Sequence, residues 1–241
     1  MNLFTVILHY GPTERTARLH RQLLESDPAE RDRVLVFDNC APEPYPDAWS
    51  RSERNLYWAG AFEHVVEVLA ERGASHLWFM NNDLLFMTRP PIIGRAKERL
   101  ARAERLAGPV GVYSPAVTGN PYHPQMVERA GGQFRQVRYV DGIAPLVSLE
   151  FWRLAEGLDY GGNPYGYGVD VWLSARAAEH GFACVVDHQV VARHRYHSTA
   201  REVDGFMEKA AAAENAYLSL RLGPGYRALM ERLAGEFREF G

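Results

Sequence analysis

The sequence has little cysteine, no long apolar run and almost no excess of charge, and each absence excludes a class of protein. Its two cysteines, Cys40 and Cys184, stand far apart, which excludes a disulfide framework and the spacing of a zinc site. No apolar stretch approaches the ~20 residues that span a bilayer. The net charge of −3 gives no cationic field that would favour nucleic acid.

The N-terminal residues lack the basic segment and the cleavage site of a signal peptide, and they are typical of a first strand. With free thiols as well, we expect a cytoplasmic protein. Peripheral association with a membrane stays open.

What remains is a globular α/β pattern in a chain of 241 residues, of which 46% are apolar. That length predicts one large domain, or a domain with a small appendage. Short apolar runs alternate with amphipathic stretches, which indicates a mostly parallel, Rossmann-like sheet flanked by helices. We expect strands at 4–9, 33–39, 77–80, 111–117, 144–148, 182–186 and 190–192. We expect helices at 13–26, with Thr13 as its cap, 61–72, 93–106, 149–155 and 169–180, and further helices from 202 onward.

Polar side chains follow two of the predicted strands at the point where each strand ends. The apolar run Leu77–Met80 leads directly into Asn81, Asn82 and Asp83, and the strand at 33–39 ends in Asp38. Ligands of open α/β sheets bind at the carboxyl ends of strands. A carboxylate between apolar flanks is costly to bury unless it is paired or holds a metal. A polar turn is the alternative for each segment, but their repetition predicts a site at this edge.

Five segments, in their order and spacing, resemble glycosyltransferase family 2, which has the A-type glycosyltransferase fold. The resemblance covers roughly residues 4–198, and the Asn-Asn-Asp variant is similar to that of rhamnosyltransferase-like members. The segments are Val34–Asn39, Asn55–Gly60, His76–Phe86, Gly168–Arg176 and Val190–His194.

The resemblance implies an inverting enzyme that moves a sugar from a nucleotide-diphosphate donor to a hydroxyl acceptor in glycan or glycoconjugate biosynthesis. The acceptor class stays open between a glycan, a lipid-linked and a small-molecule acceptor. The implied domains are a catalytic domain at 1–200 and a C-terminal helical extension at 201–241. The catalytic domain divides into a nucleotide-sugar half, 1–118, and an acceptor half, 119–200. The extension could cover the domain, pair with a second copy in a homodimer, or approach a membrane.

The resemblance also implies a metal site. Asp83 is the expected carboxylate ligand of Mn²⁺ or Mg²⁺, His194 the expected second ligand, and His197 its competitor. Both ions accept carboxylate, phosphate and water oxygens, and manganese accepts imidazole. Asn81 replaces the first acid of the usual motif, and its amide can hydrogen-bond a ribose or a metal-bound water.

The nucleotide pocket has further implied residues. Asp38 resembles the acid that recognises the base or the ribose, with an end-of-strand turn as the alternative. The remaining donor-binding residues implied by the resemblance are His9, Tyr10, Gly11, Asn55 and Asn82.

Asp170 is the implied catalytic base, because one positioned carboxylate can take the acceptor's proton. An acid at a helix start is also favoured as a cap or dipole partner, which is the alternative. Val169 replaces the Glu of the family pattern, which leaves the acceptor contacts open. Tyr165 and Tyr167 could face the acceptor, whereas Trp172 is expected in the core.

Two other functions compete with catalysis by such an enzyme. A non-catalytic nucleotide-sugar-binding relative would explain Asn81 and Val169, although Asp83, Asp170 and His194 are retained. A nucleotidyltransferase on a related core ranks last, because the first strand is not followed by a glycine-rich basic loop for a triphosphate.

Overall fold

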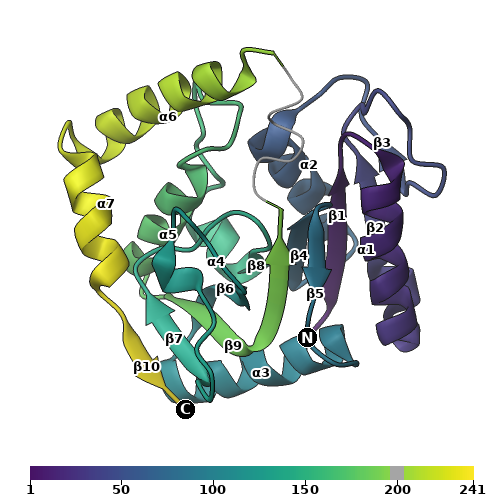
Figure 1. The fold of residues 1–241 in the computed structure, drawn as a ribbon, viewed down its shortest axis with the longest axis horizontal. Coiled ribbons are helices and arrows are strands. Elements are labelled where there is room, and N and C mark those ends of the chain that lie inside the picture. The colour runs from purple at the N-terminus through teal and green to yellow at the C-terminus, as the bar shows by residue number, and fades with distance from the viewer. Residues whose placement is uncertain (196–203) are drawn as a thin grey trace.

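The computed structural model describes residues 1–195 and 204–241. Within these residues a ten-stranded sheet has the order β10-β7-β9-β6-β8-β4-β1-β2-β3, with β5 paired to β9. Helices lie along both sides of the sheet (Figure 1). This arrangement confirms the expected α/β class.

The strands are β1 (Leu3–His9), β2 (Val34–Asp38), β3 (Ser50–Arg51), β4 (His76–Asn81), β5 (Leu84–Phe86), β6 (Val110–Val117), β7 (Phe134–Val137), β8 (Leu146–Ser148), β9 (Ala183–His194) and β10 (Arg238–Phe240). The helices are α1 (Thr13–Ser26), α2 (Tyr57–Glu71), α3 (Ile92–Ala107), α4 (Leu149–Leu154), α5 (Val169–Glu179), α6 (Phe206–Leu222) and α7 (Tyr226–Gly235), with short 3₁₀ turns at Pro28–Arg33 and Pro124–Met126.

The parallel strands β2, β1 and β4 position the polar residues of the chain's first third. β1 pairs with β2 on one side and with β4 on the other. The chain therefore crosses the sheet in one direction from β1 to β2, through α1, and in the opposite direction to reach β4, through α2. Right-handed crossovers therefore place α1 and α2 on opposite faces of the sheet. In register, His9 lies beside Asp38 and Leu8 beside Asn81, so all three strands end at one edge.

The other half of the sheet mixes directions. β8 runs antiparallel between β4 and β6, and β9 runs parallel to β6. β9 is one strand of 12 residues, whereas the sequence predicted two short ones. The polar segment Asp187–Gln189 mimics a loop, yet Asp187 bonds Arg99 and His188 bonds the backbone N–H of Arg129. These partners let polar side chains remain inside a strand.

Two helix starts also differ from expectation. α2 begins at Tyr57, one turn earlier than the predicted 61. Thr13 does not cap α1 but is its first residue, and Pro12 occupies the cap position. The Thr13 hydroxyl instead donates to the Glu43 carboxylate at 2.5 Å.

The C-terminal residues contain more than helices. Figure 1 shows α6 crossing above α5 and α7 descending to β10, which lies at the edge beside β7. The predicted helical extension therefore also adds a strand to the main sheet. α6 packs closely on the start of α5, where a Cβ on Gly168 would lie 2.9 Å from the Leu218 side chain. None of the described helices is both long enough and apolar enough to cross a membrane.

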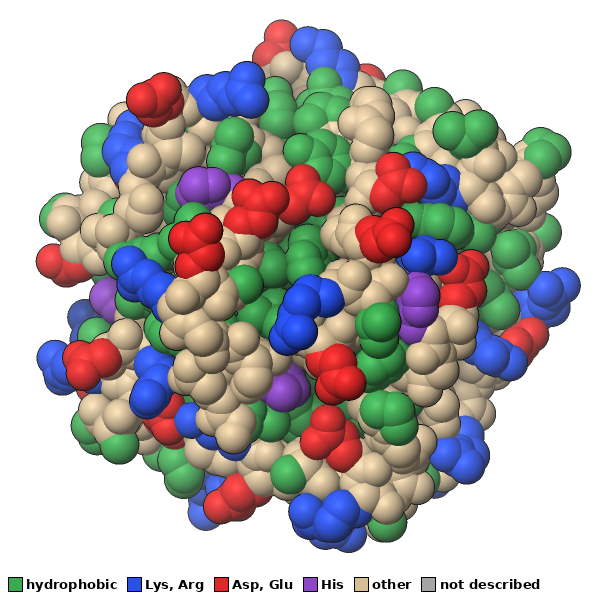
Figure 2. Space-filling view, turned by 180° about the vertical axis from the view of Figure 1, so that it is seen from behind, with side chains coloured by type: hydrophobic (Ala, Val, Ile, Leu, Met, Phe, Trp, Pro, Cys, Tyr) green, Lys and Arg blue, Asp and Glu red, His purple; other side chains and the backbone are tan. Residues whose placement is uncertain are grey.

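Surface charge is mixed on the face seen in Figure 2, where acidic and basic side chains alternate and neither sign forms a continuous field.

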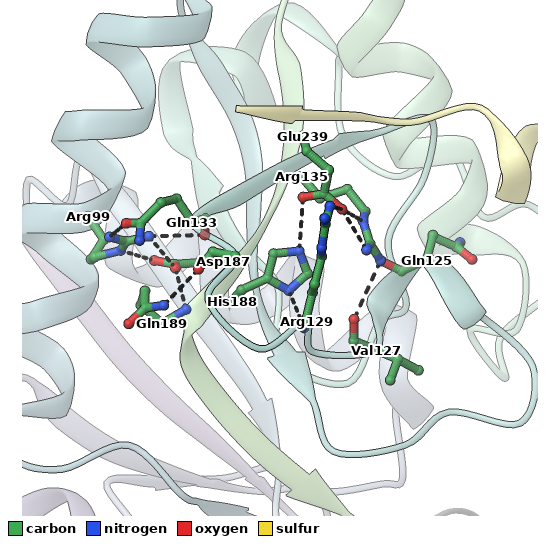
Figure 3. Close-up of polar contacts among 11 residues, drawn as sticks. Arg99, Gln125, Val127, Arg129, Gln133, Arg135, Asp187, His188, Gln189 and Glu239 are labelled. Atoms are coloured by element: carbon green, nitrogen blue, oxygen red, sulfur yellow. Dashed lines mark hydrogen bonds and ion pairs between the residues drawn. The ribbon is translucent and has the colours of Figure 1, made fainter. Parts of the chain in front are cut away.

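Ion pairs hold together the end of the sheet formed by β9, β7 and β10 (Figure 3). There Arg99 of α3 reaches Asp187 of β9, and Arg135 of β7 reaches Glu239 of β10.

Candidate functional site

A cleft of about 530 Å³ opens at the edge where β1, β2 and β4 end. Its opposite wall comes from the segment after β7, from the start of α5 and from α6. Predicted residues from five separate segments of the chain meet here, together with others that the sequence did not single out. The predicted residues in its lining are Tyr10, Asn55, Asn81, Asn82, Asp83, Tyr165, Tyr167, Asp170 and His194.

The predicted metal ligands are brought together by strand pairing. β5 runs antiparallel to the end of β9, with Leu84 opposite His194, so Asp83 reaches the imidazole. Asp83 Oδ1 lies 2.9 Å from His194 Nε2. The Asp83 side chain is largely buried, at 8% exposure for the residue, where a carboxylate needs a partner.

A divalent cation fits this pair as a partly protein-bound ion. Among the described residues, no group of three His, Cys, Asp or Glu side chains is placed to hold a metal. Mg²⁺ commonly binds one or two carboxylates and completes its shell with water and substrate phosphate, and Mn²⁺ accepts both carboxylate and imidazole. Asp83 and His194 can supply two such ligands. His197, the expected competitor, lies outside the described residues.

The two asparagines before Asp83 have different surroundings. Asn81 ends β4 and lines the cleft. Asn82 is largely buried, and its amide donates to the Tyr10 carbonyl at 3.1 Å and to the Thr16 hydroxyl at 3.0 Å. Asn82 thereby ties the end of β4 to the end of β1, which is a scaffolding contact at the floor of the cleft.

Asn39 builds the wall next to β2 and was not predicted. Its amide donates to Asn55 Oδ1 at 2.9 Å and to the Tyr57 carbonyl at 3.1 Å, and it accepts from Leu56 N at 2.8 Å. These bonds hold Tyr57 at φ 54°, in the left-handed region that a bulky side chain rarely adopts. The residues before α2 are thereby fixed against the cleft.

Three predicted donor residues do not line the cleft. Gly11 lies outside the lining, and His9 is fully buried, with its ring bonded to Thr16 Oγ1 and the Glu43 carbonyl. Asp38 is also fully buried. His9 and Asp38 end their strands as predicted, but their side chains are buried inside the protein.

Asp38 shows why. Its carboxylate accepts from the Ala41 and Tyr45 backbone N–H groups at 2.8 and 3.0 Å, and from Arg51 at 2.6 Å. It therefore stabilises the turn after β2, which is the alternative that the sequence left open.

Asp170 lies at the start of α5 and is held through both oxygens. Oδ2 accepts from Gly142 N at 2.7 Å and Oδ1 from Val171 N at 2.8 Å. Burial is the largest cause that raises the pKa of Asp170, and the charge of Asp141 is the next. The two N–H bonds lower the pKa and the charge of Glu214 raises it slightly, so that the net pKa is about 8. A carboxyl with such a pKa can take up a proton near neutral pH.

The acids around Asp170 were missed by the sequence analysis. Asp141 lies between β7 and β8 in a short, mostly apolar connecting segment, and Glu214 lies on α6. Burial raises the pKa of Glu214, while Arg227 lowers it. The one local signal in the sequence is Gly142 next to Asp141, because a glycine allows the backbone to approach a neighbouring group closely. No lysine or arginine stands among the described residues of the cleft lining.

Aromatic side chains close the far side of the cleft. Tyr57, Tyr165 and Phe206 contact one another, with ring centroids 4.9 to 6.3 Å apart. Trp58 also lines the cleft and stacks on Phe62, 5.2 Å between centroids. Trp172 lies outside the lining, packs against the core and carries the Arg221 guanidinium over its ring at 5.0 Å.

Comparison of the sequence with protein-family models finds no match. Uncharacterized proteins of Mycobacterium tuberculosis and Mycobacterium bovis are each 28% identical over 248 residues, which cover 100% of this chain and 91% of the relative. Their descriptions assign no activity.

Solved structures resemble the fold at low sequence identity. A mannosyltransferase from Pyrobaculum calidifontis, in complex with GDP-Man and Mn²⁺, matches 95% of this chain and 64% of its own with a TM-score of 0.57 and 14% identity. The structure of GalNAc-T7 with UDP, GalNAc and Mn²⁺ matches 81% of this chain and 43% of its own, with a TM-score of 0.56 and 11% identity. The crystal structure of a mycobacterial protein matches 90% of this chain and 74% of its own, with a TM-score of 0.57 and 13% identity. These similarities show a glycosyltransferase-like A-type fold, and this chain spans less than two thirds of the two transferases.

Proposed function

We propose that this protein is an inverting, metal-dependent glycosyltransferase that uses a nucleotide-diphosphate sugar. The observation that carries the proposal is the opposition, in one cleft, of the Asp83–His194 pair and the raised-pKa carboxyl of Asp170. The first suits a divalent cation, and the second suits a base. The A-type fold and the ligands of the two transferases of similar structure support this assignment.

The charge of the cleft supports a metal requirement. Its described lining holds four carboxylates, Asp83, Asp141, Asp170 and Glu214, and no lysine or arginine. A diphosphate entering such a cleft would be repelled unless a cation came with it. A divalent ion held by Asp83 and His194 would neutralise the charge that develops on the leaving diphosphate.

Asp170 would receive the proton of the acceptor. The acceptor oxygen forms a bond to the anomeric carbon while the bond from that carbon to the diphosphate oxygen breaks. The electron pair of the broken bond leaves with the diphosphate, and the acceptor's proton passes to Asp170. Because the acceptor attacks from the side opposite the leaving group, one displacement inverts the anomeric centre.

The two walls of the cleft would divide these tasks, and the acceptor wall would combine the expected acceptor half, 119–200, with Phe206 of the C-terminal extension. Asn39, Asn55 and Tyr10 line the part of the cleft at the ends of β1 and β2, where we place the nucleotide sugar. Tyr165, Tyr167 and Phe206 line the opposite wall, where we place the acceptor. Aromatic faces suit the apolar faces of sugar rings, so a glycan or glycoconjugate acceptor is proposed.

A thermal-shift screen of nucleoside diphosphates and nucleotide sugars, each with and without Mn²⁺, tests the proposal. Ligand binding to the native state raises the melting temperature by mass action. We expect a manganese-dependent rise with one nucleotide class, which is lost in Asp83→Ala and kept in Asp32→Ala, a variant of an exposed carboxylate.

Release of nucleoside diphosphate from the stabilising donor then tests for turnover. No shift with any nucleotide would contradict the proposed function, and an equal shift in Asp83→Ala would remove Asp83 from the metal site. Donor binding without transfer or hydrolysis would favour the non-catalytic alternative, for which Asn81 in place of an acid is the supporting feature.

A further inference from the structure

The segment between β7 and β8 joins the two functional sides of the cleft. On one side, Val140 N donates to Ser174 Oγ at 3.2 Å and Gly142 N donates to Asp170 Oδ2 at 2.7 Å, which binds the segment to α5. On the other side, the Ile143 carbonyl accepts from Asn81 N at 2.9 Å, which binds it to β4. Asp141 lies between the two attachments to α5.

The backbone next to Asp141 is tightly packed at Gly142. A Cβ on Gly142 would lie 3.2 Å from Trp58 Cζ2 and 3.4 Å from Asp170 Oδ2. The small residue therefore lets the N–H approach the Asp170 carboxylate beneath the indole ring. Asp170 is held in place from outside its own helix.

The Asp141 side chain is itself oriented. Its Oδ2 accepts from Asn120 Nδ2 at 2.9 Å, and Asn120 Oδ1 accepts from the backbone N–H groups of Tyr122 and His123 at 2.9 and 2.8 Å. This arrangement presents a second carboxylate to the cleft wall beside Asp170. No cation of the described lining neutralises it.

Asp141 thus occupies a role that α5 does not fill. Val169, the residue directly before Asp170, is apolar and fully buried, so it offers no acid to the cleft. We propose that Asp141 is the positioning residue of the catalytic carboxylate: its segment fixes Asp170, and its charge keeps Asp170 able to take a proton. This inference rests on the function proposed above.

The charges around Asp170 support this assignment. Burial is the largest cause of its raised pKa, Asp141 the next among those that raise it, and Glu214 of α6 a smaller one. Three tyrosines also face it: burial raises the pKa of Tyr139, Tyr167 and Tyr217 most, and the Asp170 charge adds a smaller rise in each. Asp141 is therefore the group whose removal should change Asp170 most.

Carboxyl ¹³C NMR of the protein without ligand tests the proposal directly, with the Asp170 signal assigned by its loss in Asp170→Asn. We expect the titration midpoint of Asp170 to fall by about 1 pH unit in Asp141→Asn, because a nearby like charge is removed. We expect a smaller fall in Glu214→Gln and none in Asp32→Asn. Asp141→Glu, which restores the charge, should restore most of the shift.

An unchanged Asp170 midpoint in Asp141→Asn would overturn the inference. If that variant does not fold, Asn120→Ala decides on the same criterion, because it releases the Asp141 carboxylate from its orientation and should lower the midpoint. Once a donor is known, the acidic limb of the kcat/KM profile should move to lower pH in the same order of variants. The NMR result stands without turnover, so failure of the proposed function and failure of this inference are distinguishable.

Discussion

Two clusters of buried charge in this protein are built on opposite principles. At the far end of the sheet, Asp187 is fully buried and accepts from Arg99 through two nitrogens at 2.7 Å and from Gln189 N at 2.8 Å (Figure 3). It also accepts from the Tyr113 hydroxyl at 2.6 Å. In the cleft, Asp170 accepts from two backbone N–H groups and has Asp141 as a like-charged neighbour. One cluster neutralises its carboxylate, and the other accumulates charge of one sign.

The difference indicates what each cluster is for. Arg99 also donates to Gln133 and lies 4.1 Å over the Phe134 ring, so its guanidinium holds α3, β7 and β9 together. A paired buried ion of this kind stabilises a fold chiefly because either partner alone would be costly. Like charges gathered in a cleft lower stability, and their perturbed pKa values are typical of functional sites.

The largest expected effect is on turnover at the cleft. Asp170→Asn should lower the rate of sugar transfer by about 10²–10⁴-fold, because a neutral amide cannot take the acceptor's proton. Donor binding with manganese should persist, since Asp83 and His194 are untouched. Single-turnover kinetics together with the thermal shift measure the two effects, and an unchanged transfer rate would remove Asp170 from its proposed role.

The next largest effect is on stability at the paired cluster. Asp187→Asn leaves the charge of Arg99, whose side chain is only 12% exposed, without its partner. We expect the free energy of unfolding to fall by about 3–5 kcal/mol in urea titrations, with the Asp170 midpoint unchanged.

The matched control for that prediction is an exposed pair. Glu236→Gln removes the partner of Arg138, where the side chains are 38% and 58% exposed, and should change stability by less than about 0.5 kcal/mol. Equal losses in the two variants would show that burial does not set the contribution of Asp187.

The sequence predicted the cleft better than the side chains that complete it. Apolar runs ending in polar residues located the ends of β1, β2 and β4, and parallel pairing necessarily gathers those ends at one edge. Asp83 lies in the cleft for this reason, whereas Asp170 and His194, which the family resemblance implied, come from the start of α5 and the end of β9. Asp38 has the same local pattern as Asp83, but Arg51 and two turn amides take up its carboxylate. No local pattern distinguishes an acid that binds a ligand from one that holds a turn.

Tertiary contacts explain the remaining errors. Asp141 and Glu214 become neighbours of Asp170 only because the segment between β7 and β8 and helix α6 fold over the start of α5. The polar residues Asp187–Gln189 interrupt an apolar pattern and therefore predict a loop. Their partners, Arg99 and Arg129, come from distant segments and keep them within β9. Such partners cannot be inferred from periodicity along the chain.

The smallest effect expected within the cleft is a pH-dependent gain of stability in Asp170→Asn. A free aspartate has a pKa of 3.8 and the folded pKa of Asp170 is about 8, so between these values the native state binds a proton that the unfolded state has lost. The contribution of Asp170 to the stability of the wild type is therefore full below about pH 4 and is lost as pH rises to about 8. Below about pH 4, Asp170 is protonated in both the native and the unfolded state. There the variant differs from the wild type only because its single amide oxygen cannot accept from both Gly142 N and Val171 N. Across the window the variant should gain at least about 1 kcal/mol relative to the wild type, or roughly 2–4 °C in Tm.

Melting curves of the metal-free protein at pH 5 and pH 8 measure this gain. A constant difference between variant and wild type at both pH values would mean that the cleft carboxylate is as well compensated as Asp187, and the contrast between the two clusters would no longer hold.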